Sequence, residues 1–159
     1  MANRPVDLLI AYRVIKMLVT PFDKQPAFKY GIIDKDGNVL KKYNTIKGTE
    51  EKRAYTILHK FVFNLKRILA KVGIRGALGS FAVAAALLLK ENKEYEKYKT
   101  LIESTIIKHL KETNQYDDFL AEHREIPDID DEPIGTYFGV DVYERNGELV
   151  SEFDYAKTL

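Results

Sequence analysis

Apolar residues recur along most of the chain at the spacing of helices with a buried side. Over residues 5–19 they cover most of the helical circumference, so we expect a largely buried helix that ends at Thr20-Pro21. A second apolar stripe runs through residues 50–72, which predicts one long helix with Thr49 as its N-cap. Three further helices are expected, over residues 80–90, 100–111 and 116–124. The first of these is rich in Ala and Leu and is the expected centre of the core.

Two segments have the pattern of strands on either side of a tight turn. Residues 27–43 flank Asp36-Gly37, and residues 137–153 flank Asn146-Gly147. The sequence therefore predicts an α+β fold, with a mostly helical core of four or five helices and two β-hairpins. The predicted parts are a helical domain with a hairpin insertion (1–125), an acidic linker (126–133) and a C-terminal hairpin segment (134–159).

The composition is that of an ordinary soluble globular protein, with 159 residues of which 45% are hydrophobic and 31% charged. There is no cysteine, which excludes disulfides, thiolate nucleophiles and zinc–cysteine sites. The most apolar stretch, residues 77–89, is shorter than the roughly 20 residues that a membrane span requires. We therefore expect a core helix there and no association with a membrane.

Positive and negative charges are separated along the chain. Residues 1–75 hold 16 Lys and Arg against 6 Asp and Glu, a balance of +10, and residues 76–159 hold 9 against 18, a balance of −9. A basic half attracts phosphate or an acidic partner, and two complementary halves favour head-to-tail self-association. We therefore expect a homo-oligomer or a partner of opposite charge.

The predicted helix over 50–72 carries cations on the side opposite its apolar face. Successive side chains turn by about 100°, which gathers these cations, and no acid occurs between Glu51 and Glu91. The basic stripe consists of Arg53, Lys60, Arg67 and Lys71, continued by Arg75 in the next loop. Such a stripe is either an ordinary solvated face or a surface that meets DNA phosphates or an acidic protein surface.

Three other segments suggest ligands less specifically. Residues 34–38 resemble the start of a calcium loop, but the twelfth position counted from Asp34 is Thr45 instead of Glu, so a plain turn is favoured. Residues 73–80 contain Gly-x-x-Gly and are either a turn between helices or a loop that receives phosphate. The acidic linker contains four carboxylates that could bind a divalent cation, although a solvated linker is the commoner reading.

No pattern of residues identifies an enzyme. The histidines are His59, His109 and His123, which are far apart and lack metal-binding spacing. Nucleophile elbows, dinucleotide-binding glycines and kinase motifs do not occur. We therefore expect a non-enzymatic protein without a metal or cofactor.

An ordered series of short phrases runs through the first 90 residues. The phrases are DLLIAYRVIK (7–16), VTPF (19–22), GIIDKDG (31–37), AYT (54–56) and FNLKR (63–67). In this order, over about residues 7–90, the chain resembles a family of small uncharacterised proteins encoded by tailed bacteriophages. The resemblance implies a viral context and a place in the virion, and it supplies no catalytic residues. Members of that family often end in a Gly-rich tail, whereas a second hairpin is predicted here.

These observations predict a structural or DNA-associated component of a tailed-phage virion, present in the host cytoplasm before assembly. The expected partners are other virion proteins, further copies of the chain, and viral DNA at the basic stripe. The alternative is a phage-encoded nucleic-acid-binding regulator that works in the host cytoplasm. An enzyme of unrecognised type is the third possibility.

Overall fold

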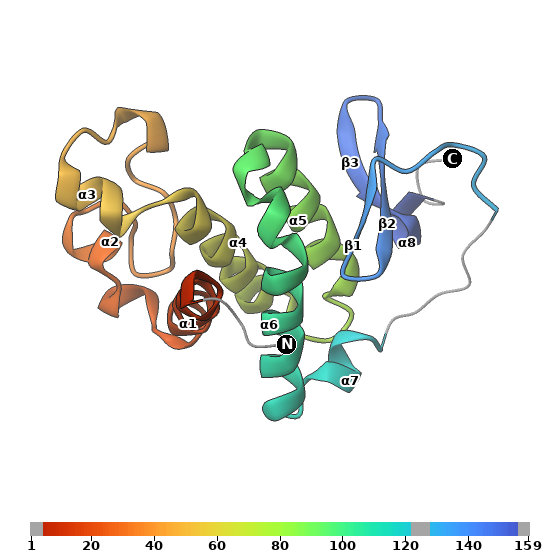
Figure 1. Cartoon of the computed structure of the whole chain (residues 1–159), viewed down its shortest axis with the longest axis horizontal. Helices are drawn as coiled ribbons and strands as arrows, with labels where there is room; N and C mark the ends of the chain where they lie inside the picture. Colours follow the sequence, from red (N-terminus) through yellow and green to blue (C-terminus); the bar gives the residue numbers. More distant parts are fainter. Residues whose placement is uncertain (1–4, 122–127, 156–159) are drawn as a thin grey trace. The chain divides into compact units, whose positions relative to one another are not determined.

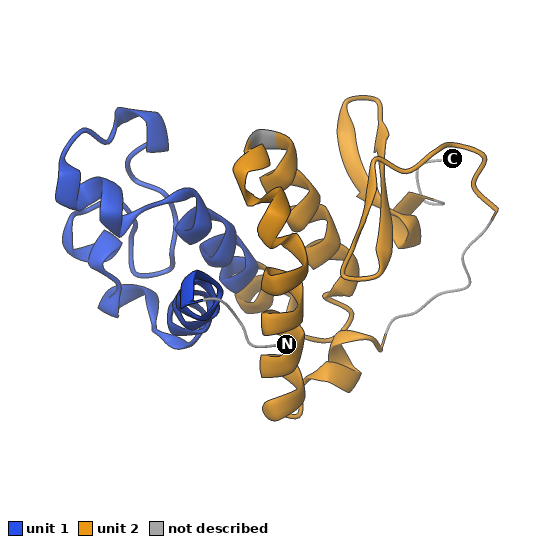
Figure 2. Cartoon of the chain, in the orientation of Figure 1, with its two compact units in different colours: residues 1–67 blue, residues 68–159 orange. Residues whose placement is uncertain are grey.

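The computed structural model describes residues 5–121 and 128–155. Within these ranges it contains eight α-helices, where four or five were predicted, and one three-stranded sheet (Figure 1). The structure is 61% helical, which confirms the α+β class. The chain divides into two compact units, residues 1–67 and 68–159, which we call the N-terminal and C-terminal units (Figure 2). The division lies within a helix, whereas the sequence prediction placed its linker at 126–133. None of the described helices is long and apolar enough to cross a bilayer.

The N-terminal unit consists of short helices around an aromatic core. Phe63 is fully buried, and its ring meets those of Phe22, Tyr55 and His59 at centroid distances of 5.5, 6.0 and 5.6 Å. Aromatic rings packed edge-on or tilted stabilise a core by more than the burial of their apolar surface alone provides. The elements are α1 (Pro5–Val19), α2 (Pro26–Lys29), α3 (Thr49–Ala54), the first part of α4 (Ile57–Val72), and the 3-10 helices η1 (Phe22–Lys24) and η2 (Tyr43–Thr45).

Helix α1 has the predicted bounds, but the prediction that it is largely buried is wrong. Only Val14 and Met17 are buried, while Leu8, Tyr12 and Val19 are more than half exposed. A small unit packs against only one side of a helix, so apolar residues around the whole circumference cannot all be covered.

The first predicted hairpin is also wrong. Residues 26–29 form α2, and a single bridge joins Ile33 to Val39. The predicted turn is present, because the Gly37 N–H donates to the Asp34 carbonyl at 3.0 Å and Gly37 has φ +83°. The backbone N–H groups of both Leu40 and Lys41 then donate to the Ile32 carbonyl, so the chain leaves the register that a ladder requires.

The predicted long helix over 50–72 is interrupted at Tyr55 and Thr56. Thr56 Oγ1 accepts a hydrogen bond from the His59 N–H at 3.3 Å, and His59 Nδ1 accepts one from the Thr56 N–H at 3.2 Å. This reciprocal pair is a capping box in which histidine takes the place of Glu or Gln. This capping box marks the start of α4 as a helix separate from α3. The N-cap of α3 is Gly48, without a side-chain hydrogen bond, so the prediction of Thr49 is wrong.

The C-terminal unit is organised around α5 (Leu78–Glu91), which contacts all three strands. Phe81, Ala82 and Ala86 are fully buried, which confirms the prediction that this helix is a core element. The Phe81 ring meets Phe119 and Phe138 edge-on, at 5.0 and 5.8 Å. The other helical elements are η3 (Lys93–Tyr98), α6 (Lys99–Glu112), α7 (Tyr116–Phe119) and α8 (Glu152–Tyr155). Helix α6 confirms the prediction over 100–111, whereas 122–124 of the predicted 116–124 helix lie outside the described residues.

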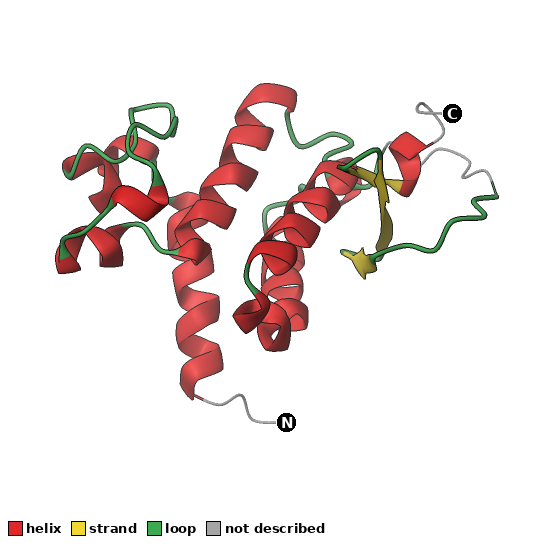
Figure 3. Cartoon of the chain, turned by 90° about the horizontal axis from the view of Figure 1, so that it is seen from above, coloured by secondary structure: helices red, strands yellow, loops and turns green. Residues whose placement is uncertain are grey.

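One antiparallel meander forms the sheet, with the strand order β1 (Gly135–Tyr137), β2 (Val140–Arg145) and β3 (Glu148–Ser151). Figure 1 labels the three strands, and Figure 3 shows the sheet in yellow. Strands β2 and β3 confirm the second predicted hairpin, and Asn146 and Gly147 between them have φ +53° and +81°. Those angles suit a type I′ turn. Strand β1 was not predicted. Of the predicted acidic linker, residues 128–133 have no helix or strand, and 126–127 lie outside the described residues.

The Asn146-Gly147 turn offers a local test of the hairpin. Gly147→Ala should lower the free energy of unfolding by about 1–2 kcal/mol, because a Cβ is strained at positive φ. A Cβ at Gly147 meets no atom within 4 Å, so strain alone causes the loss. Urea denaturation measures it, and an unchanged midpoint would contradict the turn geometry.

Candidate nucleic-acid interface

The structure distributes the basic stripe over three segments. Arg53 lies on α3, Lys60, Arg67 and Lys71 lie on α4, and Arg75 lies in the loop after α4. Because α3 and α4 are separate helices, Arg53 does not continue the face of α4. Lys60 and Arg67 remain on one side of α4, separated by roughly two turns. Lys71 and Arg75 belong to the C-terminal unit.

Arg67 has a structural contact that the sequence did not reveal. Its Nη1 donates to the Gly37 carbonyl at 2.6 Å, so it holds the turn at residues 34–38. The same turn uses the Asp34 carboxylate, which accepts the N–H groups of Asp36 and Asn38, both at 2.9 Å. The hydrogen bond from the Asn38 N–H is the main reason why the pKa of Asp34 is lowered. Arg67 is therefore part of the fold and a poor choice of phosphate contact.

The remaining members of the stripe lie at the surface. Arg53 is 3.6 Å from Glu50, and Arg75 is 3.8 Å from Asp118, with all four side chains more than half exposed. Exposed ion pairs contribute between 0 and about 1 kcal/mol, so a phosphate can compete with them. Lys60 and Lys71 are also exposed. These four cations are accessible to a ligand.

The glycine loop after α4 is a turn whose amides are used within the fold. The Gly73, Gly76 and Ala77 N–H groups donate to the carbonyls of Leu69, Asp118 and Ile74, at 2.9, 3.0 and 3.1 Å. Gly73 has φ +79°, as expected of a residue just after a helix. These three donors are not available to phosphate, so the structure favours the turn over the phosphate-binding loop.

Of the described histidines, His59 has a structural role. His59 is partly buried in the capping box of α4, and burial, with a smaller contribution from Arg13, lowers its pKa to about 4. His109 lies on α6, and His123 lies outside the described residues. In the part of the chain that the structure describes, no three His, Asp or Glu side chains gather as a metal site would require.

A set of lysines and aromatic residues in the N-terminal unit was missed by the sequence prediction. Phe28, Tyr30 and Tyr43 are 37%, 39% and 44% exposed. Exposed lysines adjoin them in the phrases Phe28-Lys29-Tyr30 and Lys41-Lys42-Tyr43. These repeated phrases could have indicated the surface from the sequence. They were overlooked because a hairpin was predicted there, in which alternate residues are buried. We call Lys29, Tyr30, Lys41, Lys42 and Tyr43 the lysine–tyrosine surface.

The separation of charge follows the two structural units. The N-terminal unit holds 14 Lys and Arg against 6 Asp and Glu, a balance of +8. The C-terminal unit holds 11 against 18, a balance of −7. The electrostatic potential around the N-terminal unit is therefore positive, and that around the C-terminal unit is negative.

Comparison with protein-family models, curated proteins and solved structures found no match to this chain.

Proposed function

We propose that the protein is a non-enzymatic, DNA-associated component of a tailed-phage particle, and that its N-terminal unit is the part that meets DNA. The observation that carries the proposal is the difference in charge between the units, +8 against −7. A positive unit is drawn to the phosphate backbone irrespective of sequence. The viral setting is supported by the resemblance of residues 7–90 to proteins of tailed bacteriophages.

The contacts of the basic stripe show which of its residues can still meet DNA. Lys60 and Arg53 are exposed, and among the described residues Arg53 forms a weak surface pair with Glu50. Arg67 is held by Gly37 and contributes to the fold. The acidic C-terminal unit repels phosphate and is suited to a basic protein surface, such as the N-terminal unit of another copy.

Binding to duplex DNA should be insensitive to sequence and should fall steeply with salt. If Arg53, Lys60 and one or two further cations of the N-terminal unit each neutralise a phosphate, the slope of log K against log salt is about −3 to −4, from roughly −0.9 per contact. The variant Arg53→Ala/Lys60→Ala should have a slope shallower by about two, because it removes two exposed cations. Fluorescence anisotropy with a labelled duplex, at several salt concentrations, measures both slopes.

A matched control removes two exposed lysines from the acidic unit. Lys93→Ala/Lys108→Ala changes the net charge by the same amount and should leave the slope unchanged. Absence of duplex binding even at low salt would refute the duplex-binding surface of Arg53 and Lys60. Mass spectrometry of purified particles tests the location, since a stoichiometric copy number supports a virion component. Absence from particles would favour the alternative, a nucleic-acid-binding regulator in the host cytoplasm.

A further inference from the structure

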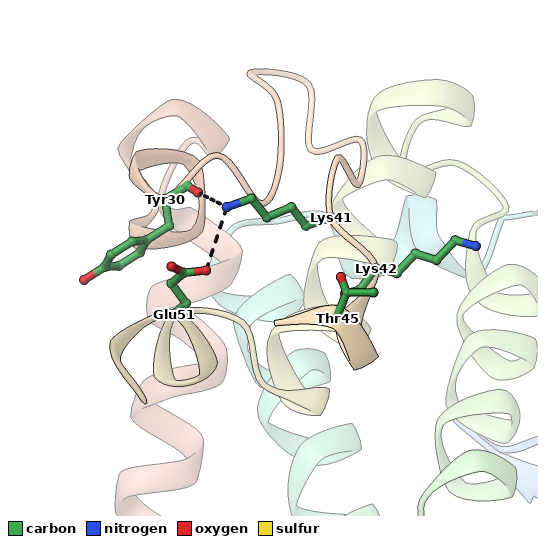
Figure 4. Close-up of polar contacts among 5 residues, drawn as sticks. All are labelled: Tyr30, Lys41, Lys42, Thr45 and Glu51. Carbon is green, nitrogen blue, oxygen red and sulfur yellow. Dashed lines mark hydrogen bonds and ion pairs between the residues drawn. The ribbon is translucent and has the colours of Figure 1, made fainter. Parts of the chain in front are cut away.

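The lysine–tyrosine surface is brought together by Lys41. Its Nζ donates to the Tyr30 carbonyl at 3.0 Å and lies 3.8 Å from a carboxylate oxygen of Glu51 (Figure 4). Two phrases separated by ten residues of sequence, each with a lysine beside an aromatic residue, therefore become neighbours in the fold. Glu51 neutralises Lys41 locally, so Lys41 acts here as a structural link.

Tyr30 and Tyr43 are both exposed, and contacts within the fold hold the Tyr30 backbone and one side of the Tyr43 ring. The Tyr30 backbone is fixed at both ends, because its N–H donates to the Pro26 carbonyl at 3.2 Å and its carbonyl accepts from Lys41. Tyr43 has one side supported by the buried Tyr55, at a ring-centroid distance of 6.3 Å. An exposed ring on a fixed backbone can accept a stacking partner at little cost in conformational entropy.

The cations around these rings are available to an anion. Lys29 and Lys42 are exposed, and neither of them forms an ion pair among the described residues. In Figure 4 the Tyr30 ring and the Lys42 side chain extend in opposite directions from Lys41. A ligand that meets both must therefore be extended, as a polymer is.

We propose that the lysine–tyrosine surface binds an unpaired nucleic-acid strand, with bases stacked on Tyr30 and Tyr43 and phosphates beside Lys29 and Lys42. Exposed aromatic rings among lysines are the combination by which proteins hold single strands without reading their sequence. A duplex hides the faces of its bases, so the rings distinguish unpaired from paired strands. The proposal rests on the proposed function in taking the N-terminal unit as the part that meets nucleic acid.

The test compares labelled oligo(dT), oligo(rU) and a duplex of equal length by fluorescence anisotropy at low salt. The wild type should bind at least one of the single strands more tightly than the duplex, and the tighter of the two identifies DNA or RNA as the source. Tyr30→Leu and Tyr43→Leu should each weaken single-strand binding by about 5- to 150-fold, and leave duplex binding unchanged. Because the chain has ten tyrosines and no tryptophan, quenching of tyrosine emission reports the stacking independently.

Two variants separate stacking from other effects of substitution. Tyr30→Phe keeps a ring and should retain wild-type affinity for the single strand. Tyr12→Leu removes another tyrosine of the same unit, which is 61% exposed on α1, and should also leave affinity unchanged.

The possible results distinguish this proposal from the proposed function. If Tyr30→Leu and Tyr43→Leu bind the single strands as the wild type does, or if no single strand is bound, the stacking proposal is overturned. Duplex binding with a steep salt dependence would then still support DNA association. If single strands bind through the tyrosines and the duplex does not bind, the stacking proposal is supported and the duplex surface is refuted.

Discussion

Phe81→Ala should lower the free energy of unfolding by about 3–5 kcal/mol, the cost of removing a fully buried phenyl ring from a core. Phe81 is 0% exposed, and its ring meets the edges of Phe119 and Phe138. Four of the next five residues of α5 are alanines, at positions 82, 84, 85 and 86, and they are too small to fill the space that the ring leaves. The loss should appear as a lower urea midpoint with an unchanged dependence on urea.

Two leucines on the same helix provide the controls. Leu88→Ala, at a position 8% exposed, should cost about 2–5 kcal/mol, whereas Leu87→Ala, at a position 42% exposed, should cost well under that. The sequence did not distinguish these neighbours, and the structure places Leu88 inward. Equal shifts for Phe81→Ala and Leu87→Ala would show that α5 is not the centre of its unit.

The elements that the sequence predicted well are those determined by local interactions. Helices α1, α5 and α6 follow the apolar spacing, and the β2–β3 turn follows from Asn146-Gly147. The break between α3 and α4 was missed because apolar spacing continues through it. The signal was Thr56-x-x-His59, in which histidine replaces the usual Glu or Gln of a capping box.

The predictions that failed depended on contacts between distant parts of the chain. The turn at residues 34–38 formed as predicted, but a turn signal does not ensure that its two arms pair. Arg67 bonds to a carbonyl thirty residues earlier in the chain, which helical spacing cannot show. The sign of the net charge of each half was visible from the sequence, whereas the hydrogen bond between Lys41 and Tyr30 could be seen only in the fold.

Acid should weaken the fold through His59, between pH 6.5 and pH 4. The pKa of this histidine is lowered from 6.5 to about 4, first by burial and then by Arg13. Over this range the unfolded chain binds a proton that the folded chain does not, so the free energy of unfolding falls as the pH falls. The full contribution is present above pH 6.5, and about 3 kcal/mol is lost by pH 4. Urea denaturation at half-unit steps of pH measures the curve.

His59→Gln is the variant that isolates this effect. Glutamine at the N3 position of a capping box can accept the Thr56 N–H, and it does not titrate. The variant should therefore lose most of the fall in stability between pH 6.5 and pH 4, whatever its stability at pH 7.5. His109→Gln removes a histidine from the other unit and should keep the wild-type curve. If His59→Gln has the same dependence on pH as the wild type, the neutral, buried histidine at the start of α4 is not the source of the acid sensitivity.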